Sequence, residues 1–441
     1  MNNEALPRPF VMIDGYNLNL EKGTGVATYA RNISYCLKTL GYETGILYGR
    51  KVPRKGSELM REIMFFDQTP QPQRLKVFRD ALDFVAAPFG VLAAHVPLAS
   101  NVIYDTFRGT MPNFDSLWNA PDLYQRAQRH FRFWNVPLKV RTSRLPDLMH
   151  WTYPVPVRMS GVPNIYTLHD LVPLRLPYTT LDIKHRYLKL VKMIASQAAH
   201  LVTVSETSKR DIINLLGVPE DRITNTFQSV SIPDSYRLKP LDVLRTELQG
   251  SFRVTYKEYF IFFGAIEPKK NVGRLIEAYL ASNVDAPLLL VGAKAWKSDQ
   301  ELKLLASLKK VANNRVRLVD YVSYPMLVNL IRGAKATLFP SLYEGFGLPV
   351  LESMVLGTPV LTSAIGSLAE VAGDAALLVD PYSTQSISEG IRVLNVDEEL
   401  RASMSERGLK RATYFSQERY DRAMQDVYQR TLSKRGLSGV L

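Results

Sequence analysis

Cysteine is nearly absent from this chain, since Cys36 is the only one among 441 residues. A single cysteine excludes an internal disulfide framework and fits a reducing compartment, so we expect a cytoplasmic protein. The chain also lacks any Asp-x-Asp sequence, and its six histidines do not show the spacing of zinc ligands. We therefore expect no catalytic metal and no bound cofactor.

Long apolar runs are missing as well. The longest one, FVAAPFGVLAAHVPLA at residues 84–99, contains Pro88, Gly90, His95 and Pro97, which make it a poor membrane-spanning helix. Residues 1–14 contain no basic segment followed by an apolar run, so we expect neither a signal peptide nor an anchor there.

Charge is unequally divided, with 55 Lys and Arg against 42 Asp and Glu and a net charge of +13. A positive field favours anionic partners, namely phosphates, nucleic acid or an acidic membrane surface. The basic residues near 50–55 and 126–132 are not part of a recognisable nucleic-acid-binding motif, so we expect no nucleic acid partner. We also expect peripheral contact with an anionic membrane, on its inner face, through the basic first half and residues 84–99.

Short β-branched runs alternate with helical patterns along both halves, which is typical of parallel α/β sheets. The length is too great for one compact core and predicts two domains of roughly 200 residues each. A break in the periodicity at 229–256 predicts a linker, and no elements are assigned at 50–145. The predicted strands are residues 10–14, 43–48, 164–168, 201–204, 259–263, 287–291, 316–319, 336–339, 359–362 and 376–379.

Two doubly wound domains that face each other predict a ligand in a central cleft, outside the carboxyl ends of the strands. The stretch FPSLYEGFGLPVLESMVLGTPVLTS at residues 339–363 combines a strand, a loop and a helix at such a place. Pro349 near the start of this helix and Gly357 past its end are typical helix punctuation. Glu344 precedes the helix and Glu352 lies inside it, so the two carboxylates can address two parts of one elongated ligand.

The start of the same helix offers free backbone amides. They favour negative charge, and glycine permits the close approach that a pyrophosphate needs. The residues that carry these amides are Gly345, Phe346, Gly347 and Leu348.

The sequence EGFGLPVLE resembles the E-x7-E signature of glycosyltransferase family 4 (retaining enzymes with nucleotide-sugar donors and two Rossmann-like domains, the GT-B fold). Six further segments resemble the family in the right order: residues 167–174, 201–212, 262–279, 288–296, 315–322 and 367–381. The resemblance runs from about residue 10 to 432 and is weakest at 50–145. It implies an acceptor-binding domain at 1–235, a nucleotide-sugar-binding domain at 250–412, and a C-terminal helix within 413–441 that crosses back onto the first domain.

The resemblance also implies roles for individual residues. Glu352 would accept hydrogen bonds from the ribose, Glu344 from the donor sugar, and Lys270 would neutralise the diphosphate. Many family members have an arginine where Ala265 stands, so phosphate binding here would depend more on Lys270 and on backbone amides. No role is transferred to Glu267 or Lys269, which lie in the same stretch.

Further donor contacts are implied at two other strand ends in the second half. Tyr321 and Val322 follow a strand that faces the nucleotide base in similar enzymes, where backbone groups read the base edge. Gly292 resembles a glycine that approaches the phosphates, and a plain tight turn is its alternative.

In the first half, KGTGVATYA at 22–30 places Gly23 and Gly25 in a loop that opens a helix. A structural turn explains a lone G-x-G equally well. His169 ends a predicted strand and Asp170 follows it, which favours a position in the cleft. In the family, this His-Asp pair contacts the sugar or the acceptor.

The resemblance therefore implies a retaining hexosyltransferase of the mannosyltransferase or rhamnosyltransferase type, and the absence of metal-ligand motifs predicts that it is metal-independent. Its partners would be a nucleotide-sugar donor, which serves as co-substrate, and a saccharide or lipid-linked acceptor of surface polysaccharide synthesis. The alternatives are a nucleotide-sugar epimerase or phosphorylase on the same fold, or a non-catalytic binding subunit. Donor base, acceptor, linkage and oligomeric state are not encoded in these motifs.

Overall fold

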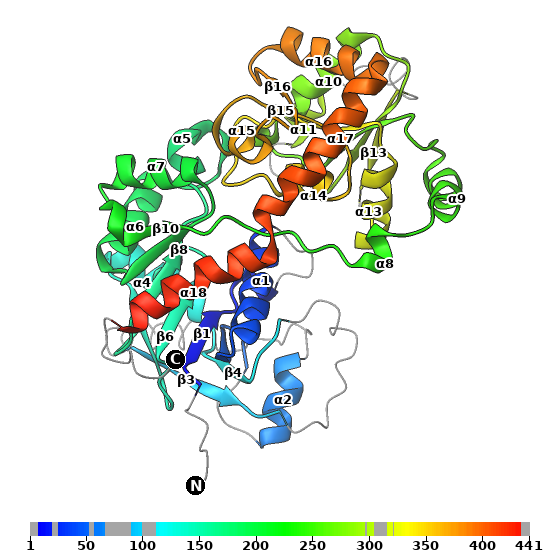
Figure 1. Cartoon of the computed structure of the whole chain (residues 1–441). Helices are drawn as coiled ribbons and strands as arrows, with labels where there is room; N and C mark the ends of the chain where they lie inside the picture. Colours follow the sequence, from blue (N-terminus) through cyan, green and yellow to red (C-terminus); the bar gives the residue numbers. More distant parts are fainter. Residues whose placement is uncertain are drawn as a thin grey trace.

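The computed structural model describes residues 8–19, 25–52, 57–66, 90–98, 112–295, 298–303, 315–320 and 322–433. Figure 1 shows two groups of elements, with the N-terminal strands in the lower part of the view and the later helices in the upper part. Each group is built around its own sheet.

The first sheet is mixed and has ten strands within the described ranges. Every pairing is parallel except that of β3 with β4. Its spatial order is β10-β9-β8-β6-β1-β2-β4-β3-β5-β7, so the chain reverses direction of winding between β1 and β6. The strands are β1 (Phe10–Asp14), β2 (Glu43–Tyr48), β3 (Val91–Val96), β4 (Ser116–Asn119), β5 (Leu138–Thr142), β6 (Leu148–Trp151), β7 (Val157–Met159), β8 (Asn164–Thr167), β9 (His200–Thr203) and β10 (Ile223–Asn225).

The second sheet is wholly parallel, with the order β13-β12-β11-β14-β15-β16 among the described residues. This is the strand order of a Rossmann fold, whose ligand site lies where the winding reverses, between β11 and β14. The strands are β11 (Phe260–Phe263), β12 (Leu288–Val291), β13 (Val316–Val319), β14 (Ala336–Phe339), β15 (Val360–Ser363) and β16 (Leu377–Val379). All ten predicted strands are confirmed to within one residue at each end.

Helices cover both sheets and bury their apolar faces against them. In α1, for example, Ala27, Ala30, Ile33 and Leu37 recur at helical spacing and are buried. The helices before the second sheet are α1 (Gly25–Thr39), α2 (Glu58–Phe66), α4 (Leu123–Trp134), α5 (Val172–Arg175), α6 (Lys184–Gln197), α7 (Glu206–Leu216), α8 (Asp234–Arg237) and α9 (Leu241–Phe252). Those that follow are α10 (Val272–Ser282), α11 (Ser298–Glu301), α13 (Tyr324–Gly333), α14 (Leu348–Val355), α15 (Gly366–Ala372), α16 (Thr384–Val396), α17 (Glu398–Ala412) and α18 (Gln417–Ser433).

Two regions depart from the sequence prediction. The segment 229–256 is not an element-free linker, because it contains α8 and α9, and Leu244 and Leu248 of α9 are buried in the second half's core. Within 84–99, residues 91–96 form strand β3 of the first sheet, whose side chains alternate between buried and more exposed positions. A strand in a sheet uses its apolar residues for the core, so this part of the stretch is not a continuous apolar surface.

The C-terminal helix passes from the second half back to the first, as predicted. Figure 1 shows α17 and α18 leading from the upper group of elements to the lower one. At the crossing, the Phe415 ring packs edge-on against Phe227 and Phe346, which belong to different halves. Further along α18, the Tyr428 hydroxyl forms a hydrogen bond of 2.8 Å with His150 of β6.

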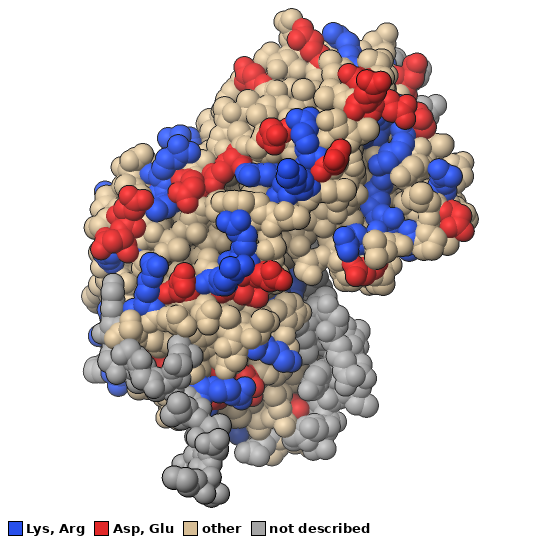
Figure 2. Space-filling view, in the orientation of Figure 1, with Lys and Arg blue, Asp and Glu red and all other residues tan. Residues whose placement is uncertain are grey.

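The surface charge is mixed on the face drawn in Figure 2. Basic and acidic side chains are interspersed there over both halves of the molecule. None of the described helices has the length and apolar character that crossing a bilayer requires.

Candidate active site

The predicted site residues of the second half come together where its sheet reverses winding. Strand β11 leads through Gly264 into a short 3-10 turn, Pro268–Lys270, and strand β14 leads into the loop that contains Glu344. The Leu342 amide donates to the Lys269 carbonyl over 2.8 Å, which ties the two loops together. Residues 74 positions apart in the chain thereby face each other at the carboxyl edge of the sheet.

Glu344 is held between two lysines. Lys270 Nζ donates to Glu344 Oε1 at 2.6 Å, and Lys269 Nζ lies 3.6 Å from Oε2. Burial alone would raise the pKa of this 7% exposed carboxyl, but the Lys270 and Lys269 ammonium groups outweigh burial and lower it. Glu344 is therefore a fixed carboxylate.

Glu352, which lies eight residues after Glu344, has a different environment. It lies within α14, and burial raises the pKa of its carboxyl to about 7, although the positive charge of Lys270 opposes this rise. No described residue donates a hydrogen bond to its carboxylate. This side chain is thus able to accept hydrogen bonds from a ligand.

The start of α14 is shaped as the sequence predicts. Gly347 precedes the helix with a φ of 119°, and Pro349 occupies its first turn. The amides of residues 345–348 find no acceptor among the described residues, and the Glu344 carbonyl accepts from Ser367 Oγ at 2.6 Å. The helix therefore presents free donors at its positive end.

The first half meets this loop at His169 and Asp170. A Cβ on Gly345 would lie 2.7 Å from the His169 carbonyl oxygen and 3.1 Å from Asp170 Oδ2. Any side chain at 345 would push the two halves apart, so glycine is required there by close approach. Nearby, Ser208 Oγ of α7 donates to the Gly345 carbonyl at 3.2 Å.

His169 is neutral and oriented. Its Nε2 lies 2.9 Å from the Thr152 carbonyl, which can only accept, so Nε2 carries the proton and Nδ1 keeps its lone pair. Burial lowers the pKa of the ring, while the Thr152 hydrogen bond and Asp170 oppose this. The Tyr29 ring packs edge-on at 4.6 Å between centroids and fixes the imidazole further.

Asp170 is anchored within its own loop. Its Oδ1 accepts from the Val172 amide at 3.0 Å, and its carbonyl accepts from the Tyr187 hydroxyl at 3.1 Å. The loop that carries His169 and Asp170 is therefore held in place from the first half's own core.

The remaining predicted residues are only partly brought to this place. A Cβ on Gly25, at the start of α1, would lie 3.2 Å from a Leu348 methyl, so this glycine does reach α14. Position 292 accepts only glycine, because a Cβ there would lie 1.9 Å from the Gly264 carbonyl oxygen. Val322 lies just before α13, whereas Gly23 and Tyr321 lie outside the described residues.

Sequence reasoning missed three residues at this site. It gave Lys269 and Glu267 no role, yet the Lys269 ammonium lies against both Glu344 and Glu267. It did not single out Tyr324, whose hydroxyl pKa is raised mainly by burial and also by the charge of Glu352. The signal for the lysine was present in the pair at 269–270, but only the tertiary fold shows that both ammonium groups face one carboxylate.

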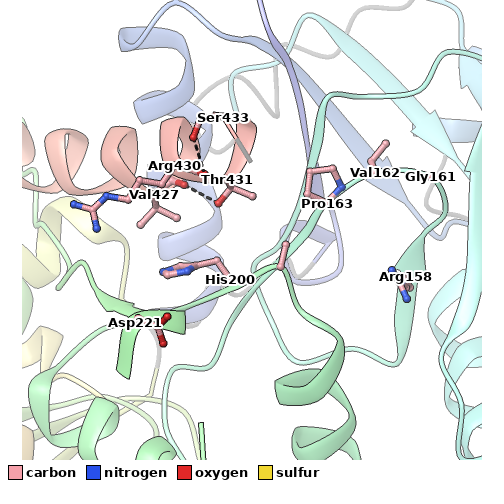
Figure 3. Close-up of a pocket in the computed structure, with 11 residues that line it drawn as sticks. Arg158, Gly161, Val162, Pro163, His200, Asp221, Val427, Arg430, Thr431 and Ser433 are labelled. Atoms are coloured by element: carbon pink, nitrogen blue, oxygen red, sulfur yellow. Dashed lines mark hydrogen bonds between the residues drawn. The ribbon is translucent and has the colours of Figure 1, made fainter. Parts of the chain in front are cut away.

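The cavity in Figure 3 is a separate feature. Its volume is about 480 Å³, and it lies between the last turns of α18 and the amino ends of β8 and β9, so it is at the opposite edge of the first sheet from His169. None of the predicted site residues lines it. Elsewhere, no three His, Cys, Asp or Glu side chains of the described ranges are grouped as metal ligands.

Comparison with known families gives two matches that follow each other along the chain. Residues 23–224 match the family described as "Glycosyltransferase Family 4", and residues 245–411 match "Glycosyl transferases group 1". The two ranges contain, respectively, His169 with Asp170 and the loop pair around Lys270 and Glu344.

Curated relatives extend this comparison. The chain is 33% identical over 259 residues to "O-antigen chain mannosyltransferase B" of Escherichia coli, covering 58% of this chain and 67% of that protein. It is 27% identical over 257 residues to "Serotype-specific mannosyltransferase WbdA" of Escherichia coli, covering 56% of this chain but only 31% of that protein. The match thus spans about two thirds of the first relative and under one third of the second.

A solved structure shares the fold. The Anabaena protein HepE, described in complex with UDP and glucose, superposes with a TM-score of 0.65 at 14% identity, over 96% of this chain and 99% of that chain. With the strand order of the second sheet and the helix that returns to the first half, this likeness confirms the predicted GT-B fold. The chain belongs to glycosyltransferase family 4.

Proposed function

We propose that this enzyme transfers mannose from a nucleotide-sugar donor to a saccharide or lipid-linked acceptor in cell-surface polysaccharide synthesis, with retention of the anomeric configuration. The observation that carries the proposal is the Lys270–Glu344 ion pair before α14, next to Gly345, which closely approaches His169 and Asp170 of the first half. The names of the two curated relatives favour mannose over a deoxyhexose such as rhamnose.

The donor diphosphate would lie at the amides of residues 345–348, beside the Lys270 ammonium. Fixed positive groups in a dry site stabilise an anionic leaving group without reorganisation. Glu352 would accept from the ribose hydroxyls, with Tyr324 beside it, and Tyr321 and Val322 would flank the base. Gly292 would allow the phosphates to pass close to the end of β12.

The reaction breaks the bond between the anomeric carbon and the β-phosphate oxygen and leaves the electron pair on that oxygen. The acceptor hydroxyl attacks from the same face, and its proton passes to the departing phosphate oxygen. Glu344, held as a carboxylate, orients the hydroxyls of the donor sugar, while the free Nδ1 of His169 accepts from a further sugar hydroxyl. Both groups act by positioning and electrostatics.

The first half would bind the acceptor, and the domain limits of 1–235, 250–412 and 413–441 remain predictions. Gly23 and Gly25 would lie in the loop that faces the donor. Peripheral contact of a basic first half with an anionic membrane remains part of this proposal. Flotation with anionic and neutral vesicles tests it: binding to anionic vesicles at low salt supports it, and no binding contradicts it.

A panel of nucleotide sugars tests the function directly. A matching donor raises the melting temperature with its concentration, because it binds the folded state. We then expect transfer to a mannose-containing acceptor, in the presence of EDTA, with the product anomer identified by NMR. Absence of stabilisation by every donor would refute a donor-binding enzyme, and an inverted product would refute retention.

The alternatives predict other outcomes in the same assays. A nucleotide-sugar epimerase would change the donor without an acceptor. A pyridoxal-type phosphorylase would show the absorbance of its cofactor. A non-catalytic subunit would bind the donor without transferring or hydrolysing it.

A further inference from the structure

Lys269 is the cation at which the two halves of the candidate site meet. Its Nζ lies 3.6 Å from Glu344 Oε2 and 3.6 Å from Glu267 Oε1, and its side chain is only 19% exposed. The charge of Asp170, from the first half, also acts on it. Two carboxylates thus flank this largely buried ammonium, and the charge of a third acts on it.

We propose that Lys269 is a positioning residue that holds Glu344 for the donor sugar while Lys270 turns to the donor diphosphate. The inference rests on the proposed function. Four side chains alternate in sign along this line, in the order Glu267, Lys269, Glu344 and Lys270.

The reason lies in how Lys270 is shared. Its ammonium pairs with Glu344 Oε1 at 2.6 Å, and the same ammonium would bind the diphosphate. Ala265 offers no second cation at the position where many family members have an arginine. When Lys270 binds the phosphate, the Lys269 ammonium still compensates the negative charge of Glu344 at Oε2.

Burial makes this compensation important. Glu267 and Glu344 are 6% and 7% exposed, and their like charges raise each other's energy in the absence of an intervening cation. Burial lowers the pKa of Lys269, but Glu344, Asp170 and Glu267 outweigh burial and raise it, so Lys269 stays charged. Removing this ammonium would raise the pKa of Glu344 and would leave its Oε2 without the cation that faces it.

The test compares Lys269→Met with Lys269→Arg and Lys270→Met. Lys335→Met is the matched control, because Lys335 is a buried lysine of the same half whose Nζ lies 3.6 Å from a carboxylate, Glu258 Oε2. Affinities for the nucleoside diphosphate alone and for the matching nucleotide sugar are measured by calorimetry, together with kcat and KM from pH 5 to 9. Melting temperatures without ligand report on folding.

For Lys269→Met we expect nucleoside diphosphate affinity within about twofold of wild type, but a loss of about tenfold in nucleotide-sugar affinity and about 100-fold in kcat. The acidic limb of its pH profile moves to higher pH, and Lys269→Arg restores most of the activity. Lys270→Met loses affinity for both ligands, and Lys335→Met loses neither.

Two results would overturn the positioning role. One is a Lys269→Met variant with wild-type kcat and an unchanged pH profile. The other is an equal loss of affinity for both ligands, which would make Lys269 a phosphate ligand. If wild-type protein itself binds no nucleotide sugar, the proposed function fails first, and the two failures are thereby distinguished.

Discussion

The two halves of the molecule bring different chemistry to the same place. The second half contributes a line of alternating charges, from Glu267 through Lys269 and Glu344 to Lys270. The first half contributes the Asp170 carboxylate and His169, an uncharged ring that is held by a carbonyl. Behind His169 lies a buried hydrogen-bonded line of Tyr29, Thr167, His150 and Tyr428.

This difference matches the two sides of a glycosyl transfer. Negative charge develops on the leaving phosphate, so fixed cations are useful on the donor side. The attacking group of the acceptor is a neutral hydroxyl, for which oriented neutral groups provide hydrogen bonds without desolvating a charge. The charged line of the second half should therefore dominate the rate, and the neutral buried line behind His169 should dominate the loss of stability in acid.

The largest effect is expected at Glu344. Glu344→Ala should lower kcat by about 10³-fold, because the donor sugar loses its fixed carboxylate, while nucleoside diphosphate binding persists. Transfer assays and calorimetry measure the two quantities. Glu389→Ala, at an exposed carboxylate of α16, serves as the control and should keep full activity. Near-normal turnover in Glu344→Ala would contradict a role of the Glu344 carboxylate in the transfer reaction.

His169→Ala should have the next largest effect, a loss of about 10²-fold in kcat. The ring is neutral in the folded protein because burial lowers its pKa, so the wild-type rate should not depend on its titration between pH 7 and 8. An ionisation near pH 6.5 to 7.5 in the wild-type rate that disappears in His169→Ala would contradict a neutral ring.

A smaller, pH-dependent effect is expected from Glu352→Gln. Burial raises the pKa of this carboxyl from 4.5 to about 7, so the folded state retains a proton that the unfolded state loses. This favours folding at low pH, and the benefit is lost as the pH rises from 4.5 through 7. The melting temperature of the variant minus that of wild type should therefore be more positive at pH 8 than at pH 5.

The same variant should bind a nucleotide sugar about tenfold more weakly, because an amide accepts less strongly from the ribose hydroxyls. Glu301→Gln provides the control for a raised carboxyl pKa outside the ligand site. A stability difference that is independent of pH would show that Glu352 is not protonated in the fold.

The two halves also differ in how many of their strands could be predicted from the sequence. Strands β11 to β16 are short, mostly apolar and alternate with helices, so this alternation located each of them. In the first half, only β1, β2, β8 and β9 were predicted, and six strands were missed: β3, β4, β5, β6, β7 and β10. None of the six is a β-branched run that is followed by a clear helical pattern, and β3 pairs with both β4 and β5. Helix α9 was taken for linker because the stretch SVSIPDSYRLKP before it breaks the periodicity, and the helix itself buries only Leu244 and Leu248.

At the site, local motifs singled out Glu344, Lys270 and His169, which lie in the loops after β14, β11 and β8, and Glu352, which lies within α14. Their roles stay predictions. Lys269 could not be assigned from sequence, because its meaning depends on Glu344, which is 75 residues away. The neutral line behind His169 was equally hidden, since Tyr428 joins His150 over 278 residues of chain.

The smallest effect is expected at that contact. Tyr428→Phe removes the hydroxyl that lies 2.8 Å from His150 Nδ1, and it should cost about 1 kcal/mol of local stability. Because the chain has two halves, hydrogen exchange of the α18 amides measures this better than a single melting temperature. Tyr42→Phe is the matched control, since the Tyr42 ring packs edge-on against Tyr428 and its hydroxyl has no hydrogen-bond partner within the described residues.

Lowering the pH should weaken the buried line of Tyr29, Thr167, His150 and Tyr428 more than the Tyr428→Phe substitution does. Burial lowers the pKa of His150 to about 3, whereas the unfolded histidine takes up a proton near 6.5. The stability that this neutral ring contributes is complete above pH 6.5 and is lost as the pH falls from 6.5 toward 3. Protection of α18 should therefore decrease from pH 7 to pH 5 in wild type, and a His150→Gln variant should show a shallower decrease. If the α18 amides of both proteins lost protection equally, the loss of stability in acid would arise from a group other than His150.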